Sequence, residues 1–96
     1  MSNFIFLNGK IILDADANIS SADRGFLYGD SIYETLRSYN GKPFKLADHL
    51  ERMRHSAKQL KISFDYTNAD IGERINELLE KNHTQDAYIR ITLSRG

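Results

Sequence analysis

Cysteine is absent from this chain of 96 residues, and proline occurs only once, at Pro43. Without cysteine the chain can form neither a disulfide nor a thiolate metal site. No run of eighteen apolar residues occurs, and the first residues lack the basic-then-apolar plan of a secretory signal. We therefore expect a cytoplasmic protein with no membrane-spanning helix.

An excess of charge of either sign is also missing, because thirteen basic residues balance thirteen acidic ones. Proteins that bind nucleic acid through phosphate contacts usually carry a basic excess or a basic stripe. We therefore expect no nucleic-acid partner. The hydrophobic content of 41% supports one modest core, so residues 1–96 should form a single domain. A partner domain or subunit could cover a remaining apolar face.

Two Asn-Gly pairs mark tight turns between apolar or alternating segments. Asn8-Gly9 separates two short runs that predict a hairpin, and the polar stretch 14–30 predicts a long loop. Residues 31–39 alternate as a strand does, and Asn40-Gly41 then turns the chain into a short strand at 42–45. Pro43 places that short strand at a sheet edge, because proline donates no ladder hydrogen bond.

From Leu46 the apolar spacing becomes helical and predicts a helix over about Ala47–Leu60. A second helix should start at an N-cap of Thr67 or Asn68 and fray near Asn82. Residues 86–94 predict a closing strand. The order of these elements predicts an α+β domain, in which two helices pack on an antiparallel sheet.

Three segments carry side chains suited to ligand binding. On the strand 31–39, Tyr33 and Arg37 share one face and could line a cavity wall. On the first long helix, Arg52 borders the apolar stripe, where its planar donors could meet a phosphate or carboxylate. On the last strand, Arg90 lies on the polar face and could bind a carboxylate. Each segment taken alone fits an ordinary solvated strand or helix face better.

Other signatures of catalysis are missing. The sequence contains no GxxxxGKS/T, GxGxxG, GxSxG or HExxH motif. His49 and His55 have no carboxylate or cysteine at ligand spacing, so we expect no metal site.

In combination, the three segments resemble the N-terminal domain of class IV (fold-type IV) pyridoxal-phosphate aminotransferases. The resemblance rests on the order and spacing of RGxxYGDSxYExxR at residues 24–37, HxxRxxxSA at 49–57 and YIRxxxxRG at 88–96. It implies an enzyme whose active site lies between this small domain and a larger C-terminal domain missing from the chain, with a partner subunit of a homodimer completing the pocket. It also implies that Arg52 binds the phosphate of pyridoxal phosphate. The lysine that forms the Schiff base with the cofactor would belong to the later segment, so we assign no catalytic residue here.

The resemblance leaves the subfamily open. Positions that branched-chain aminotransferases use around the substrate match Tyr28, Tyr33, Arg37, Tyr88 and Arg90. Arg95, within Ser94-Arg95-Gly96, matches the carboxylate-binding arginine of D-amino-acid aminotransferases, and aminodeoxychorismate lyases carry a similar sequence. Glu34-Thr35 also departs from the Glu-Gly of many branched-chain enzymes. We rank first an enzyme that moves the amino group of a branched-chain L-amino acid to 2-oxoglutarate, a 2-oxo acid.

If Arg90 and Arg95 lie on one regular strand, their spacing of five residues directs them to opposite faces. We therefore expect Arg90 on the cavity side, and Arg95 to reach a site only from the loop after the strand. A hypothesis of another class is that the 96 residues form a stand-alone, non-catalytic binding module.

Overall fold

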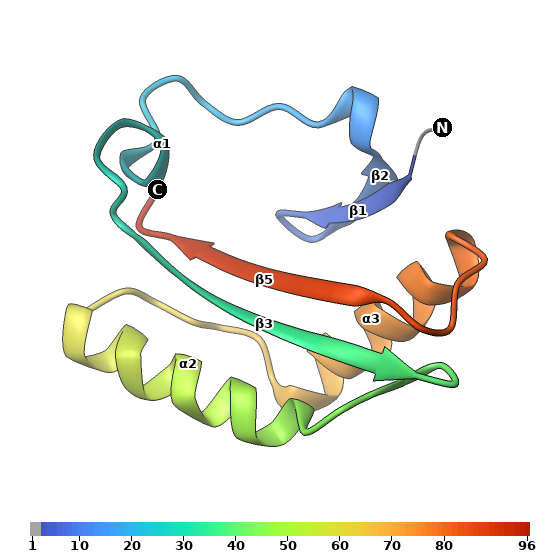
Figure 1. Ribbon diagram of the computed structural model, residues 1–96. Coiled ribbons are helices and arrows are strands. Elements are labelled where there is room, and N and C mark those ends of the chain that lie inside the picture. The colour runs from blue at the N-terminus through green and yellow to red at the C-terminus, as the bar shows by residue number, and fades with distance from the viewer. Residues whose placement is uncertain (1–2) are drawn as a thin grey trace.

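The computed structural model describes residues 3–96 as an α+β domain, as the sequence predicts. A two-stranded hairpin and a three-stranded sheet are both antiparallel, and helices pack against them (Figure 1). The elements, in chain order, are β1 Phe4–Leu7, β2 Lys10–Leu13, the 3-10 helix η1 Asp14–Asp16, α1 Arg24–Tyr28, β3 Ser31–Tyr39, β4 Lys42–Pro43, α2 Leu46–Leu60, α3 Asn68–Lys81 and β5 Tyr88–Ser94.

The first hairpin turns at Asn8 and Gly9, which adopt φ angles of 48° and 88°. Both values lie in the left-handed region that an Asn-Gly pair enters most readily, so the predicted turn is confirmed. The side chain of Asn82, the C-cap of α3, forms two hydrogen bonds with the backbone of β1. Its Oδ1 accepts from the Phe4 N–H at 2.7 Å, and its Nδ2 donates to the Phe4 carbonyl at 2.9 Å.

The main sheet has the strand order β4-β3-β5. Strand β3 covers the predicted residues and pairs along most of its length with β5. Strand β4 is shorter than the predicted 42–45, because Lys45 turns into the left-handed region and α2 begins at Leu46. It pairs only with Ser38 and Tyr39, and Pro43 lies at the sheet edge as predicted.

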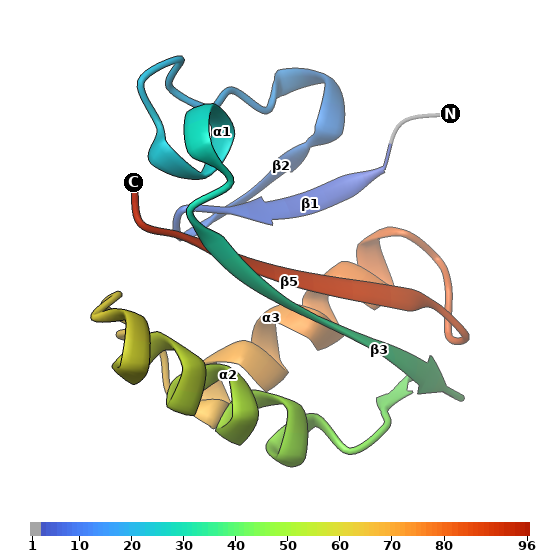
Figure 2. The same ribbon diagram turned by 60° about the vertical axis from the view of Figure 1, so that its left-hand side comes forward.

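Both long helices form where the apolar spacing places them. Thr67 caps α3, and Asp70 completes a capping box with reciprocal hydrogen bonds of 3.1 Å. Both long helices lie on one side of the main sheet, as Figure 2 shows from a second angle. Leu36, Ile89 and Ile91 of the sheet are buried or partly buried there. The buried core is made of Leu36, Leu50, Met53, Ala57, Ile62, Ile71, Ile75 and Leu79.

The long loop predicted over residues 14–30 contains two short helices that the sequence did not predict, η1 and α1. Asp23 caps α1 by accepting from the Phe26 N–H at 3.0 Å, and it also accepts from the Ser94 hydroxyl at 2.7 Å. A Cβ at Gly25 would lie 2.5 Å from Ser94 Oγ, so only glycine allows this close approach to β5. Contacts with a distant strand, invisible in the local sequence, therefore stabilise the short helix.

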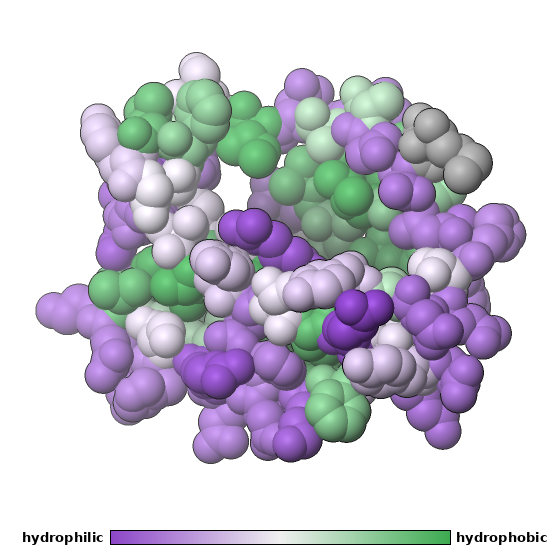
Figure 3. Space-filling view, in the orientation of Figure 1, coloured by the Kyte–Doolittle hydropathy of each residue, from purple (hydrophilic) through white to green (hydrophobic). Residues whose placement is uncertain are grey.

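Apolar side chains remain exposed around α1 and the loop before it. Ile19 and Phe26 are 65% and 69% exposed, and they border an open groove of about 350 Å³ against the first hairpin. Figure 3 shows apolar surface in this upper part of the molecule and a mainly hydrophilic surface over α2. Among the residues described, no helix has the length and apolar character needed to cross a bilayer.

Candidate functional site

Four of the predicted substrate residues gather on the face of the β3–β5 sheet that the helices leave uncovered. Arg37 pairs directly across the ladder with Tyr88, and its Cζ lies 5.1 Å from the centre of that ring. Arg90 lies diagonal to Tyr33, with its Cζ 4.2 Å from the ring centre. The alternation of β3 and β5 thus produces two neighbouring arginine–tyrosine pairs.

These contacts orient the two guanidinium groups without neutralising them. A cation–π contact at an exposed site is worth about 0.5–1 kcal/mol, and it leaves the N–H donors of the arginine available. Neither Arg37 nor Arg90 forms an ion pair with any residue in the described part of the chain. Among the described residues, the Arg90 side chain donates only to Thr92 Oγ1, at 3.3 Å. The face therefore offers two uncompensated cations beside aromatic rings, an arrangement that suits a carboxylate attached to an apolar group.

Arg52 lies on the other side of β3, where it is paired with Glu34. Its Nε lies 3.2 and 3.1 Å from the two Glu34 carboxylate oxygens, and its Nη2 lies 2.8 Å from Oε1. The Arg52 side chain is 65% exposed, whereas that of Glu34 is only 13% exposed. Hydrogen bonding from Arg52 lowers the pKa of Glu34 although burial opposes the shift, so the carboxylate is charged at neutral pH.

His49, one helical turn before Arg52, binds the same carboxylate. Its Nδ1 lies 2.7 Å from Glu34 Oε1. Because a carboxylate only accepts hydrogen bonds, Nδ1 must carry a proton. The approach of Arg52 Nη2 to that nitrogen, at 3.2 Å, is then a contact between two donors.

The two groups of residues therefore lie on opposite faces of β3, which the sequence motifs did not reveal. Residues 31–37 of β3 lack a partner strand on the β4 side, since β4 reaches only Ser38 and Tyr39. Helix α2 runs along this part of β3 (Figure 1). Arg52 and Tyr33 thus lie on the two faces of this segment of β3, whose other edge pairs with β5.

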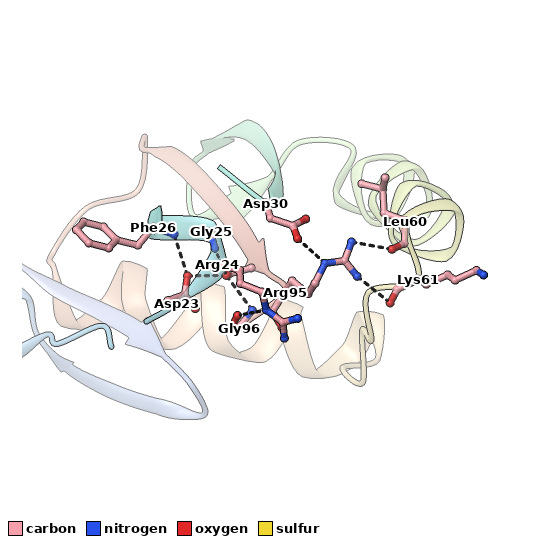
Figure 4. A network of polar contacts seen from close by, with 10 residues as sticks. Asp23, Arg24, Gly25, Phe26, Asp30, Leu60, Lys61, Arg95 and Gly96 are labelled. Atoms are coloured by element: carbon pink, nitrogen blue, oxygen red, sulfur yellow. Dashed lines mark hydrogen bonds and ion pairs between the residues drawn. The ribbon is translucent and has the colours of Figure 1, made fainter. Parts of the chain in front are cut away.

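Arg95 has a different environment from the other predicted substrate residues (Figure 4). It follows the end of β5, and its Nε donates to Asp30 Oδ2. Its terminal nitrogens donate to the carbonyl groups of Leu60 at 2.9 Å and Lys61 at 3.4 Å. These carbonyls lie at the C-terminal end of α2, where backbone acceptors lack helical partners. The structure therefore places Arg95 at the end of α2 and not on the Tyr33–Arg90 face.

Tyr28 is also separate from that face. It is the last residue of α1, is 77% exposed, and precedes Gly29 with its left-handed φ of 66°. Among the residues described, it forms no side-chain hydrogen bond. Tyr28 could line a pocket only if another domain or subunit packed against α1.

We expect Arg95→Ala to destabilise the fold. The change removes an ion pair with Asp30 and leaves two helix-terminal carbonyls without their charged donor, which should lower the free energy of unfolding by about 1–3 kcal/mol. Thermal unfolding measures this loss. Arg74→Ala is the control and should cost about 0.5 kcal/mol or less, because within residues 3–96 Arg74 pairs only with Glu73 and Glu77 on the surface of α3. Equal melting temperatures for the two variants would contradict a structural role for Arg95.

Sequence reasoning missed the partners of the predicted arginines. Glu34 lies at an inward position of β3 between Ile32 and Leu36, and a carboxylate at such a position needs a cation. That signal was present in the sequence, but the identity of the cation was not. Asp30 carries no comparable signal, since it lies in the short connection between α1 and β3. Within residues 3–96 no cluster of three or more histidine or acidic side chains could hold a metal ion.

The amino-acid sequence is similar to those of known aminotransferases. The sequence profile described as Amino-transferase class IV matches residues 31–96. A putative branched-chain-amino-acid aminotransferase from Methanocaldococcus jannaschii is 41% identical over 96% of this chain and 32% of its own length. A D-alanine aminotransferase from Staphylococcus epidermidis is 37% identical over 96% of this chain and 33% of its own length.

Solved structures extend the likeness to three dimensions. The branched-chain amino acid aminotransferase of Escherichia coli superposes with a TM-score of 0.89 at 26% identity, over 100% of this chain and 33% of that one. A similar branched-chain enzyme was solved in complex with N-(5'-phosphopyridoxyl)-L-glutamate. The chain thus spans about one third of the length of these relatives. Because the family profile covers more than half of the chain and the fold agrees, the protein belongs to the class IV aminotransferases, a family of pyridoxal-phosphate enzymes.

Proposed function

We propose that this chain is the N-terminal domain of an aminotransferase that moves the amino group of a branched-chain L-amino acid to 2-oxoglutarate. The observation that carries the proposal is the difference between the two candidate arginines. Arg90 lies beside Tyr33 on the open sheet face with no anionic partner among the described residues, whereas Arg95 is engaged by Asp30 and the end of α2. Sequence identity does not decide between a branched-chain and a D-amino-acid substrate, since the identities to the two kinds of relative, 41% and 37%, differ too little.

The residues present fit a phosphate group. The Nη1 nitrogen of Arg52 has no hydrogen-bond partner among the described residues, and the side chain is largely exposed. A guanidinium edge presents two parallel donors that match two phosphate oxygens. Arg52 would therefore hold the phosphate of pyridoxal phosphate with the edge that Glu34 does not use.

The sheet face would hold the substrate. Arg90, assisted by Arg37, would bind a carboxylate, and the rings of Tyr33 and Tyr88 would border an apolar side chain and exclude water from it. Bound pyridoxal phosphate supplies the electron sink for the electrons released at the substrate Cα. Tyr28 would close the pocket from α1.

The covalent lysine would come from outside this chain. All six lysines of the chain are exposed, and the one in the main sheet, Lys42, pairs with Tyr39 at the far end of β3. A larger C-terminal domain would supply the covalent lysine, and the complete enzyme would be a cytoplasmic homodimer that binds neither nucleic acid nor membrane. The exposed apolar groove beside α1 supports burial against another domain or subunit.

A D-amino-acid aminotransferase is the second candidate. It is supported by the D-alanine aminotransferase at 37% identity and by Ser94-Arg95-Gly96. In that enzyme Arg95 would leave Asp30 and the end of α2 to bind the substrate carboxylate. An aminodeoxychorismate lyase and a non-catalytic binding module are the remaining alternatives, and no contact in the described residues favours either.

Substrate stereochemistry tests the proposal. In the full-length protein loaded with cofactor, kcat/KM for L-leucine or L-valine should exceed that for D-alanine by about a hundredfold. This ratio corresponds to a difference of about 2.7 kcal/mol in the free energy of the transition state. The spectral change of the cofactor in single turnover measures both rates. The 96-residue chain alone is the negative control and should show no turnover. Faster reaction with D-alanine would replace the proposal with the D-specific alternative.

A further inference from the structure

Glu34 is a largely buried carboxylate for which the proposed reaction has no role. It points from β3 toward α2, and its side chain is 13% exposed. Two side chains of α2 converge on it, Arg52 through three contacts and His49 through one. No buried side-chain nitrogen or oxygen in the described residues lacks a hydrogen-bond partner.

The pairing leaves Arg52 with one edge bound and one edge free. Nε and Nη2 face the two oxygens of Glu34, and this fork of two parallel contacts sets both the position and the plane of the guanidinium. The opposite edge, with Nη1, points away from the carboxylate. A long arginine side chain without such a contact samples many rotamers, and ordering it when a ligand binds costs affinity.

His49 restricts the carboxylate in turn. Its protonated Nδ1 donates to Oε1, the oxygen that also accepts from Arg52 Nη2. The imidazole and the guanidinium therefore hold Glu34 together, and both contact its Oε1. The strand also restrains it, because Ile91 lies directly opposite in the ladder with β5.

We propose that Glu34 is a positioning residue, which holds Arg52 in the orientation that presents its free edge to the cofactor phosphate. The inference rests on the proposed role of Arg52. It runs against the simplest electrostatic expectation, in which a carboxylate near a phosphate weakens binding by repulsion. The two effects have opposite signs, so the experiment can separate them.

The test is a double-mutant cycle read out as the dissociation constant of pyridoxal phosphate for the apo form of the full-length protein. Glu34→Gln keeps the shape and removes the charge, while Glu34→Asp keeps the charge and withdraws the carboxylate by one methylene. Each should weaken binding about three- to tenfold, the cost of ordering one rotamer-rich side chain. In an Arg52→Ala background neither should change the dissociation constant. Glu51→Gln is the matched control, because Glu51 neighbours Arg52 on α2, is exposed, and forms no ion pair in the described residues.

Each outcome bears on the inference. Tighter binding by Glu34→Gln would overturn it, since the carboxylate would then only repel the phosphate. Unchanged binding by both variants, or equal weakening with and without Arg52, would also overturn it. If Arg52→Ala itself leaves binding unchanged, the proposed role of Arg52 fails as well. Thermal unfolding of each apo variant separates a loss of fold from a loss of affinity, and a general structural effect would appear in both backgrounds.

Discussion

Replacing Arg52 with alanine in the full-length protein is expected to weaken binding of pyridoxal phosphate about ten- to hundredfold. The change removes a charge-assisted contact to the phosphate that a planar guanidinium can make bidentate, and contacts of this kind are about twice as strong as neutral hydrogen bonds. It also leaves Glu34, whose side chain is only 13% exposed, without its main cationic partner. Equilibrium dialysis of the apo form against the cofactor measures the change.

Arg54→Ala is the control for this measurement. Arg54 lies two residues further along α2, and its replacement removes the same unit of charge. Its guanidinium, however, donates to the Tyr66 carbonyl and to the Asn68 side chain. We expect it to reduce stability and to leave cofactor affinity within about twofold, since long-range charge effects are screened by salt. Equal weakening by both variants would indicate a general electrostatic effect and remove the specific role of Arg52.

Arg90→Ala is expected to raise KM for L-leucine or L-valine about ten- to hundredfold, and by more than Arg95→Ala does. Arg90 carries an uncompensated charge beside Tyr33 on the open sheet face, so its loss removes a charge-assisted contact to a substrate carboxylate. Arg95 is held by Asp30 and by the carbonyls of Leu60 and Lys61. Steady-state kinetics at a temperature where both variants remain folded gives the comparison.

A conservative change supports the same test. Arg90→Lys keeps the charge but loses the planar fork and the stacking on Tyr33, so we expect it to recover only part of the affinity. If Arg95→Ala abolishes turnover of a D-amino acid while Arg90→Ala has almost no effect, the branched-chain proposal is wrong. The ion pair between Arg95 and Asp30 would then have to open when substrate binds.

Local sequence determined most elements of this fold, though not α1, and the direction of most side chains along them. Asn8-Gly9 and Asn40-Gly41 adopt the positive φ angles that their chemistry favours, and Thr67 caps α3. A strand reverses side-chain direction at every residue. This alternation placed four predicted residues on one exposed face: Tyr33, Arg37, Tyr88 and Arg90. These features depend on neighbours only a few residues apart, so the sequence was sufficient to predict them.

Tertiary structure alone decided which partner each charged group found. Arg95 contacts Asp30 and the end of α2, from which it is separated by 65 and 35 residues, and Glu34 meets Arg52 across 18. Helix α1 likewise depends on Ser94, 71 residues from its cap Asp23. Periodicity predicts the face on which a side chain lies, but not the carbonyl or carboxylate that packing brings against it. A buried or half-buried charge takes whichever partner the fold places within hydrogen-bond reach, because an unpaired charge there is costly.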